Sequence, residues 1–321
     1  MRFNPKAHLD TGRIGDAGRG GGGGLGRGGL GGGRRGGGIP IPGGVGAGGG
    51  IGTLIIIGLI FVLTQCVGGG GGLPTGGGVQ GGTDTGRMAD PERYANCRTG
   101  ADANQDVDCA RVAVENSLYN YWSRAAPELG AQFAPASMTT FSGAVNTGCG
   151  QASSQVGPFY CPPDQAIFLD TTFFTDVLEG QLGGQGGDFV EPYVLGHEYG
   201  HHVQNLLGIM GRVRTQQGPE SDAVRLELQA DCFAGAWTRA ATGTTDTDGV
   251  AIFAELDQAD ISEALDSAKA VGDDRIQQRS GGGVDPEGWT HGSAEQRMRW
   301  FSTGYESGDP ARCDTFGASE L

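Results

Sequence analysis

The chain has 321 residues, of which 64 are glycine, and its 37 acidic and 22 basic residues give a formal net charge of −15. Residues 1–50 carry seven Lys and Arg against two Asp, about +5, so the remainder is near −20. This acidic remainder argues against nucleic acid as a partner of the globular part. The length suits one large domain or two small ones.

An uncharged apolar run, residues 51–67, lies between two glycine-rich tracts at about 12–50 and 68–86. A bilayer core needs about 20 apolar residues, or slightly fewer with uncharged flanks. A buried core helix and a cleaved signal peptide are the alternatives, and the glycine flanks and the long preceding segment count against them. We therefore expect a Gly/Arg-rich disordered cytoplasmic tail at 1–50, one transmembrane helix at 51–67, a Gly-rich linker at 68–87 and a folded domain at 88–321.

The folded domain is expected to be mainly α-helical with a small β component. This prediction rests on the spacing of apolar residues, which follows the helical period of 3.6 residues. Gly and Pro mark the breaks between the expected helices. Residues 141–174 are mostly loop, with one or two short strands such as 166–169, and residues 210–217 are ambiguous. The expected helices are 109–126, ended by Pro127, then 188–207, 225–238, 260–278 and 290–304.

Basic residues before the apolar run and acidic residues after it predict a cytoplasmic N-terminus, with the folded domain outside the bacterial inner membrane. Six of the seven cysteines lie in the folded domain. An even number in an exported domain suggests disulfides, with free buried thiols as the alternative. Zinc binding by cysteine is disfavoured, because no CxxC pair occurs. Sequence spacing favours the pairs Cys97–Cys109 and Cys149–Cys161, which leaves Cys232 with Cys313.

The motif His197-Glu198-Tyr199-Gly200-His201 is an HExxH sequence within a predicted helix. Its two histidines lie one helical turn apart on the same face, so both imidazoles can reach one zinc ion. Glu198 would lie beside the metal without binding it, where it can take a proton from water. A solvated His/Glu cluster is the alternative, and the apolar neighbours of the motif argue against it.

A catalytic zinc site needs a third protein ligand and an open position. Glu227 is the best candidate, because it lies in an ExxxD pair with Asp231 on an otherwise apolar helix. Both carboxylates share one helix face, so Glu227 could bind zinc while Asp231 orients a ligating histidine. A surface acidic pair is the alternative.

With these motifs in view, the chain resembles the bacterial neutral zinc metallopeptidase family of YpfJ-type membrane proteins. The resemblance covers residues 90–316 and rests on VLGHEYGHHVQNLLGI, RLELQADCFAGAW, GDDRIQ, THGSAEQRMRWF and GDPARCDTF, which occur in the family's order. It implies a zincin-like domain with a gluzincin-like site, in which His197, His201 and Glu227 bind Zn²⁺ and Glu198 is the catalytic base. The physiological substrate does not follow from the resemblance.

His291 and Arg297 form a second candidate pair, six residues apart. A similar His and Arg spacing occurs in the CaaX-type zinc proteases, where these groups stabilise the transition state. We expect His291 to bind the developing oxyanion, with Arg297 as a further stabiliser. A helix-capping histidine with a structural arginine is the equal alternative. His202 is expected to be a core or surface residue, and Asp273 and Asp274 to be capping or structural charges.

The sequence therefore predicts a membrane-anchored zinc endopeptidase that hydrolyses peptide bonds with a zinc-activated water and Glu198 as general base. Its partners would be a protein or peptide substrate and, through one helix, the membrane. A catalytically silent, zinc-stabilised binding module at the cell envelope is the first alternative, and a structural envelope protein is the second. The sequence leaves the oligomeric state and cleavage specificity open.

Overall fold

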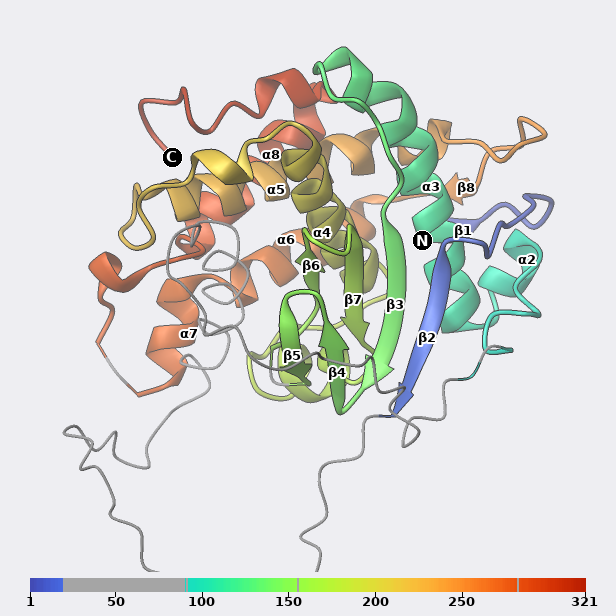
Figure 1. Ribbon diagram of the computed structural model, residues 1–321, viewed down its shortest axis with the longest axis horizontal. Coiled ribbons are helices and arrows are strands. Elements are labelled where there is room, and N and C mark those ends of the chain that lie inside the picture. Colours follow the sequence, from blue (N-terminus) through green and yellow to red (C-terminus); the bar gives the residue numbers. More distant parts are fainter. Residues whose placement is uncertain (20–89, 91, 155, 282) are drawn as a thin grey trace, which may run out of the picture.

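The computed structural model describes residues 1–19, 90, 92–154, 156–281 and 283–321 (Figure 1). This part is mainly helical with a smaller β component, as predicted. The predicted transmembrane run at 51–67 and linker at 68–87 lie outside it. Within the described ranges, no helix combines the length and apolar character that crossing a bilayer requires.

A mixed four-stranded sheet borders the helices, with strand order β2-β3-β7-β6 (Figure 1). Strands β2, β3 and β7 run parallel, and β6 runs antiparallel to β7 at the outer edge. The strand that the sequence indicated at 166–169 is β7, which is buried at every position. The bounds are Ile14–Arg19 for β2, Ser137–Ser142 for β3, Phe159–Cys161 for β6 and Ala166–Asp170 for β7.

Two smaller pairings complete the β structure. Strands β4 (Ala144–Thr147) and β5 (Gly150–Ser153) form an antiparallel hairpin, and β1 (Arg2–Phe3) pairs antiparallel with β8 (Phe253–Glu255). The hairpin covers a satellite core beside the sheet, while the main core lies between the sheet and the helices.

The predicted helices are present, with two differences in their bounds. Pro127 lies inside the last turn of its helix instead of ending it. The expected helix at 260–278 is two helices separated at Gly272, whose backbone is extended. A side chain at this position would collide with the backbone of Ala294. The bounds are Gly100–Ala103 for α2, Val107–Glu128 for α3, Val190–Leu206 for α4, Asp222–Ala240 for α5, Gln258–Ala270 for α6, Asp273–Arg279 for α7 and Ala294–Ser307 for α8.

Shorter helical segments link these elements. A π-helical turn precedes α4, and single 3-10 turns follow α4, α5, α7 and α8. The ambiguous stretch at 210–217 contains one such turn, Met210–Arg212.

Close helix packing brings α4 and α5 together beneath the sheet. A Cβ atom on Gly200 would lie 3.0 Å from Ala230 Cα, so only glycine allows this approach. On the other side of α5, a Cβ atom on Gly304 of α8 would lie 1.9 Å from the carbonyl oxygen of Cys232. Helix α5 is therefore held firmly between α4 and α8.

The N-terminal residues belong to the folded unit. Strand β2 pairs with β3, and the Arg13 guanidinium donates to the buried Glu115 carboxylate of α3 at 2.7 Å. The amino group of Met1 lies 2.6 Å from Asp260 at the start of α6. The predicted disordered tail at 1–50 is therefore wrong for residues 1–19, which fold with the domain predicted to begin at residue 88.

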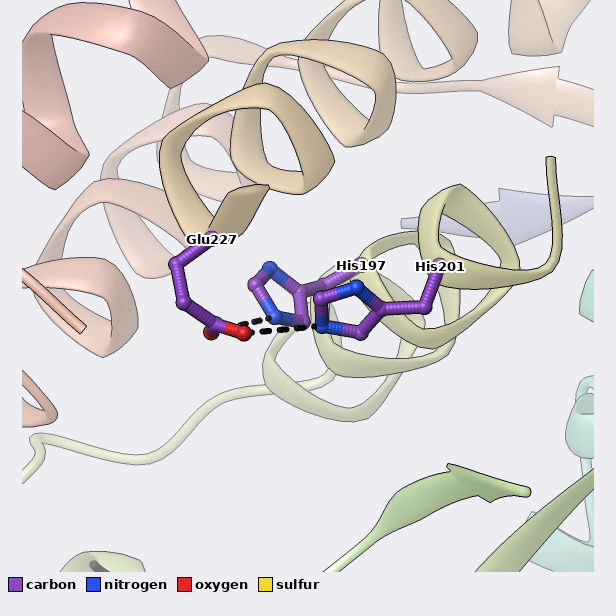
Figure 2. Close-up of side chains that lie close together, drawn as sticks. All are labelled: His197, His201 and Glu227. Atoms are coloured by element: carbon purple, nitrogen blue, oxygen red, sulfur yellow. Dashed lines mark ion pairs between the residues drawn. The ribbon is translucent and has the colours of Figure 1, made fainter. Parts of the chain in front are cut away.

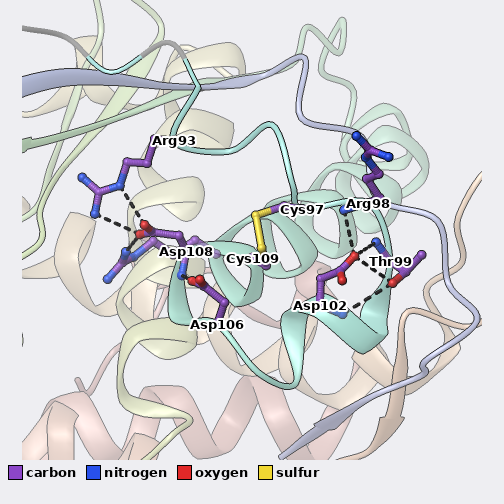
Figure 3. The surroundings of a disulfide bond; sticks show 9 residues. Arg93, Cys97, Arg98, Thr99, Asp102, Asp106, Asp108 and Cys109 are labelled. Carbon is purple, nitrogen blue, oxygen red and sulfur yellow. Dashed lines mark hydrogen bonds and ion pairs between the residues drawn. A yellow bond between two sulfur atoms is a disulfide. The ribbon is translucent and has the colours of Figure 1, made fainter.

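All three predicted disulfides are confirmed by the cysteine geometry. Figure 3 shows Cys97–Cys109, which joins the segment before α2 to the first turn of α3. Beside it, Asp106 caps α3 and Arg93 forms an ion pair with Asp108. The remaining pairs are Cys149–Cys161, between the hairpin and β6, and Cys232–Cys313, between α5 and the C-terminal segment.

Candidate metal centre

His197 and His201 project from the same face of α4 toward α5 (Figure 2). Their ring centroids are 4.7 Å apart, with the ring planes at 88°. Glu227 points at both rings from the first half of α5. One ligand atom from each of these three side chains lies within 4.8 Å of the other two, and all three are buried. The structure thus brings together the three predicted ligands.

The Glu227 carboxylate faces the two imidazoles with one oxygen each. Its oxygens lie 3.3 Å from His197 Nε2 and 3.2 Å from His201 Nε2. Burial raises the pKa of Glu227, but the two histidines lower it by more, and the net pKa is well below its usual range. Its Oε1 is buried and makes no well-formed hydrogen bond to the described residues. Two nitrogen donors and a charged oxygen converging on one point fit a zinc ion.

Asp231 orients His197, as predicted for this carboxylate. Its Oδ1 lies 2.8 Å from His197 Nδ1, which leaves Nε2 to face Glu227. Burial raises the pKa of Asp231, but Arg297 and His197 lower it to about 2, so the carboxylate stays charged. Burial lowers the pKa of His197, while Asp231 and Glu227 raise it to about 10. This raised pKa shows that the surrounding carboxylates stabilise a positive charge at the imidazole.

Arg297 is directed at Asp231. Its guanidinium donates to both carboxylate oxygens of Asp231, at 2.8 and 2.9 Å, and is buried. Tyr193 completes the arrangement by donating its hydroxyl to Asp231 at 2.7 Å. Of the two roles that the sequence left open for Arg297, these contacts favour the structural one, in which it positions Asp231.

Gln204 is a residue that the sequence interpretation missed. Its Oε1 lies 2.8 Å from His201 Nδ1, and its amide group donates to the carbonyl of Leu226 at 2.7 Å. It therefore orients His201 and also ties α4 to the turn of α5 that carries Glu227. The sequence position of Gln204 could have indicated this role, because a residue three positions after a ligand lies on the same helix face.

Glu198 lines the same buried cavity as the three ligand residues. Burial raises its pKa above the usual range of a glutamate, although both histidines partly oppose the shift. A carboxylate whose pKa is raised is a better proton acceptor than an ordinary glutamate.

His291 also lines this cavity, immediately before α8. The helix cap is Ser293, so His291 is not the capping residue. Asp273 holds the loop by accepting from the backbone N–H groups of Thr290, His291 and Gly292. Its other oxygen lies 3.3 Å from His291 Nδ1. Burial lowers the pKa of His291, but Asp273 raises it by more.

Two other residues have the structural surroundings expected of them. His202 is fully buried, and its ring nitrogens contact the Tyr160 hydroxyl and the Ala134 carbonyl on the side of α4 away from Glu227. Asp274 accepts from the backbone N–H of Ala294 at the start of α8.

Comparison with known proteins shows which protein family the chain belongs to. The model of one protein family, described as "Putative neutral zinc metallopeptidase", matches residues 14–316. The chain therefore belongs to the neutral zinc metallopeptidase family, and membership implies Zn²⁺ as the cofactor. The match includes β2, in agreement with the packing of the N-terminal residues.

Two relatives are similar over most of the folded unit. The Mycobacterium tuberculosis H37Rv protein Rv2575 is 52% identical over 229 residues, covering 71% of this chain and 76% of the relative. The Escherichia coli K12 protein YpfJ is 44% identical over 204 residues, covering 62% of this chain and 67% of the relative. No solved structure matches the chain.

Proposed function

We propose that the protein is a zinc-dependent endopeptidase, with His197, His201 and Glu227 holding the metal. Bound zinc would polarise the scissile carbonyl and make an attacking water more acidic at neutral pH. The supporting observation is the convergence of these three ligand groups beside Glu198 in one cavity. The family supports a peptidase in general terms, and the assignment of these residues is ours.

Glu198 would act as the general base. Its carboxylate takes one proton from the water that attacks the scissile carbon, and later gives that proton to the leaving amine as the C–N bond breaks. A peptide bond and one water are consumed, and a carboxyl and an amine are formed. Burial of Glu198 keeps its carboxylate weakly solvated, which favours this exchange of a proton.

His291 would donate a hydrogen bond to the oxyanion that develops on the scissile carbonyl oxygen. Its place in the cavity wall and its support by Asp273 favour this role. Arg297 would act indirectly, by holding Asp231 and through it His197. A His291→Ala variant should keep its zinc and lose about a hundredfold or more in kcat, and unchanged turnover would disprove this role.

A catalytically silent binding module is the competing function. It needs the three ligands but no base, whereas Glu198 lies in the cavity next to them. The test is zinc content and casein hydrolysis of the full-length protein beside its Glu198→Gln variant. We expect about one zinc in both, and a loss of 10²–10⁴-fold or more in hydrolysis in the variant. Equal hydrolysis by both proteins would remove Glu198 from the mechanism, and zinc in both without hydrolysis would favour the binding module.

We also propose an extracytoplasmic location for the folded unit, supported by its three disulfides. Residues 1–19 pack within this unit, so they share its compartment. A single membrane crossing at 51–67 would separate residues 1–19 from residues 92–321. We therefore propose that residues 1–19 lie on the same, extracytoplasmic side as residues 92–321, and not in the cytoplasm.

A further inference from the structure

The cavity beside the proposed ligands has a volume of about 120 Å³ and two chemically different parts. Every charged side chain in its lining belongs to the metal centre or to His291 and Arg297 beside it. The rest of the wall is contributed by β6 and the loops and helices around it, and it is largely apolar. The apolar side chains that matter here are Val156, Phe159, Phe173, Met210, Leu226 and Val271.

The two tyrosines in the lining have their hydroxyl groups engaged elsewhere. The Tyr193 hydroxyl donates to Asp231, and the Tyr160 hydroxyl contacts His202 and Asn205. Apart from the metal centre, His291 and Arg297, the described lining therefore offers no charged partner to a substrate side chain. A charged or strongly polar side chain entering this part would lose its hydration without compensation.

The volume suits one side chain. An apolar protein cavity of roughly 150 Å³ accommodates a benzene ring. The whole cavity, including its metal side, is about 120 Å³, so it has room for no more than one large aliphatic or aromatic group and not for several residues of a peptide.

The apolar wall is fixed relative to the proposed ligands. Tyr160 of β6 is held to α4 by His202 Nδ1 and Asn205 Nδ2, both at 3.0 Å. The Cys149–Cys161 disulfide fastens the end of the same strand. A preformed wall discriminates between side chains better than a loose one, because binding then costs little ordering.

We propose that the substrate class is a peptide with a large apolar residue directly flanking the scissile bond, with its side chain in this cavity. The inference rests on the proposed peptidase function and extends it to specificity. Burial of the side chain would bring the adjacent carbonyl to the metal ligands and Glu198. Val156, Phe159 and Met210 would then determine specificity without taking part in the reaction.

The first test uses heptapeptides of glycine and serine with one variable central residue: phenylalanine, leucine, alanine, serine, lysine or glutamate. Binding is measured by calorimetry on the full-length, zinc-loaded Glu198→Gln protein, and cleavage by mass spectrometry on the parent. We expect the leucine and phenylalanine peptides to bind about tenfold or more tighter than the alanine peptide, and cleavage at a bond next to the variable residue. Equal binding across the series, or a preference for lysine or glutamate, would overturn the inference.

A second test changes the cavity. Val156→Asp should remove most of the preference for phenylalanine and improve the lysine peptide, because it places a carboxylate in the apolar wall. The matched control is Val284→Asp, since Val284 is 42% exposed and outside the lining, and it should leave the series unchanged. An unaltered series in a folded Val156→Asp protein would contradict the assignment of this wall.

The two proposals fail separately. Cleavage by the parent with no dependence on the central residue would refute the specificity and leave the peptidase. Apolar-selective binding without cleavage by the parent would refute the peptidase and support the cavity as the binding site.

Discussion

Among the residues that the structure describes, two clusters bring ligand atoms of three acidic or imidazole side chains within 4.8 Å of one another, and they differ in the partners of their charged groups. The first is His197, His201 and Glu227. The second, which we call the acidic cluster, is Asp188, Asp260 and Glu263. In the acidic cluster, Asp188 and Asp260 accept from the amino group of Met1 at 2.8 and 2.6 Å, and Glu263 accepts from the backbone N–H of Phe189.

Each carboxylate of the acidic cluster therefore already has a hydrogen-bond donor, and only Asp260 of the three is buried. At the metal centre, by contrast, two imidazoles face a buried carboxylate, and Glu227 Oε1 makes no well-formed hydrogen bond to the described residues. Proximity of ligand atoms alone does not distinguish these clusters. The clusters are distinguished by the burial of the first one and by the Glu227 oxygen that lacks a well-formed hydrogen bond there. Both features favour the first cluster as the zinc site.

The largest effect on stability is expected from replacing Arg13. This residue and the acidic cluster both hold the N-terminal segment, residues 1–19. Arg13→Ala leaves Glu115 buried without its cation, so we expect a loss of about 3–5 kcal/mol in the free energy of unfolding. Burial already raises the pKa of Glu115, and losing Arg13 raises it further. Protonation removes the uncompensated charge, so the deficit should shrink as pH falls. Denaturant unfolding of the parent and the variant at two pH values measures this difference in the free energy of unfolding.

The control for that variant is Arg2→Ala. Arg2 lies in the same N-terminal segment and forms an exposed ion pair with Glu255 of β8, with 65% and 57% of their side chains accessible. Exposed pairs contribute about 0–1 kcal/mol, so the change should be small. Equal effects of the two substitutions would show that residues 1–19 are not part of the folded unit.

The next variant, Asp231→Asn, is tested at the metal centre of the folded protein, because it also lowers the stability by leaving the buried Arg297 guanidinium without its anion. The amide keeps the shape of the side chain but no longer accepts the His197 proton as a charged partner. Loss of such an orienting carboxylate typically costs 10–100-fold in metal affinity. Zinc competition with a chelating dye measures it, and an unchanged affinity would mean that Asp231 does not orient the ligand.

The smallest effect is expected for Asp260→Asn in the acidic cluster. The substitution weakens the contact with the Met1 amino group and should cost about 1–2 kcal/mol of stability. Zinc affinity should stay unchanged, since this cluster holds no zinc in our interpretation. A loss of bound zinc in this variant would contradict the distinction between the two clusters.

The metal centre could be predicted because its geometry is local. HExxH fixes two ligands by helical spacing, and ExxxD supplies a carboxylate pair on one face of a second helix. The three disulfides followed from cysteine spacing. Gln204 was equally local, lying three residues after His201, and a check of the helix face would have found it.

Residues 1–19 could not be predicted in the same way. Strand β2 pairs with β3, which lies more than one hundred residues away in the sequence. The short, glycine-containing sequence of β2 does not indicate which distant strand it pairs with. The need for glycine at position 272 has a similar origin, because it depends on the approach of Ala294. Long-range packing decides both features, and sequence periodicity contains no record of it.

The most direct test of the central claim is the zinc content of the purified full-length protein and two neighbouring variants after dialysis. His201 faces Glu227, whereas His202 faces Tyr160 on the other side of α4. We predict about one zinc per chain in the parent and in a folded His202→Gln protein, and almost none in His201→Ala. Full zinc in His201→Ala, or no zinc in the parent, would contradict the proposed metal centre.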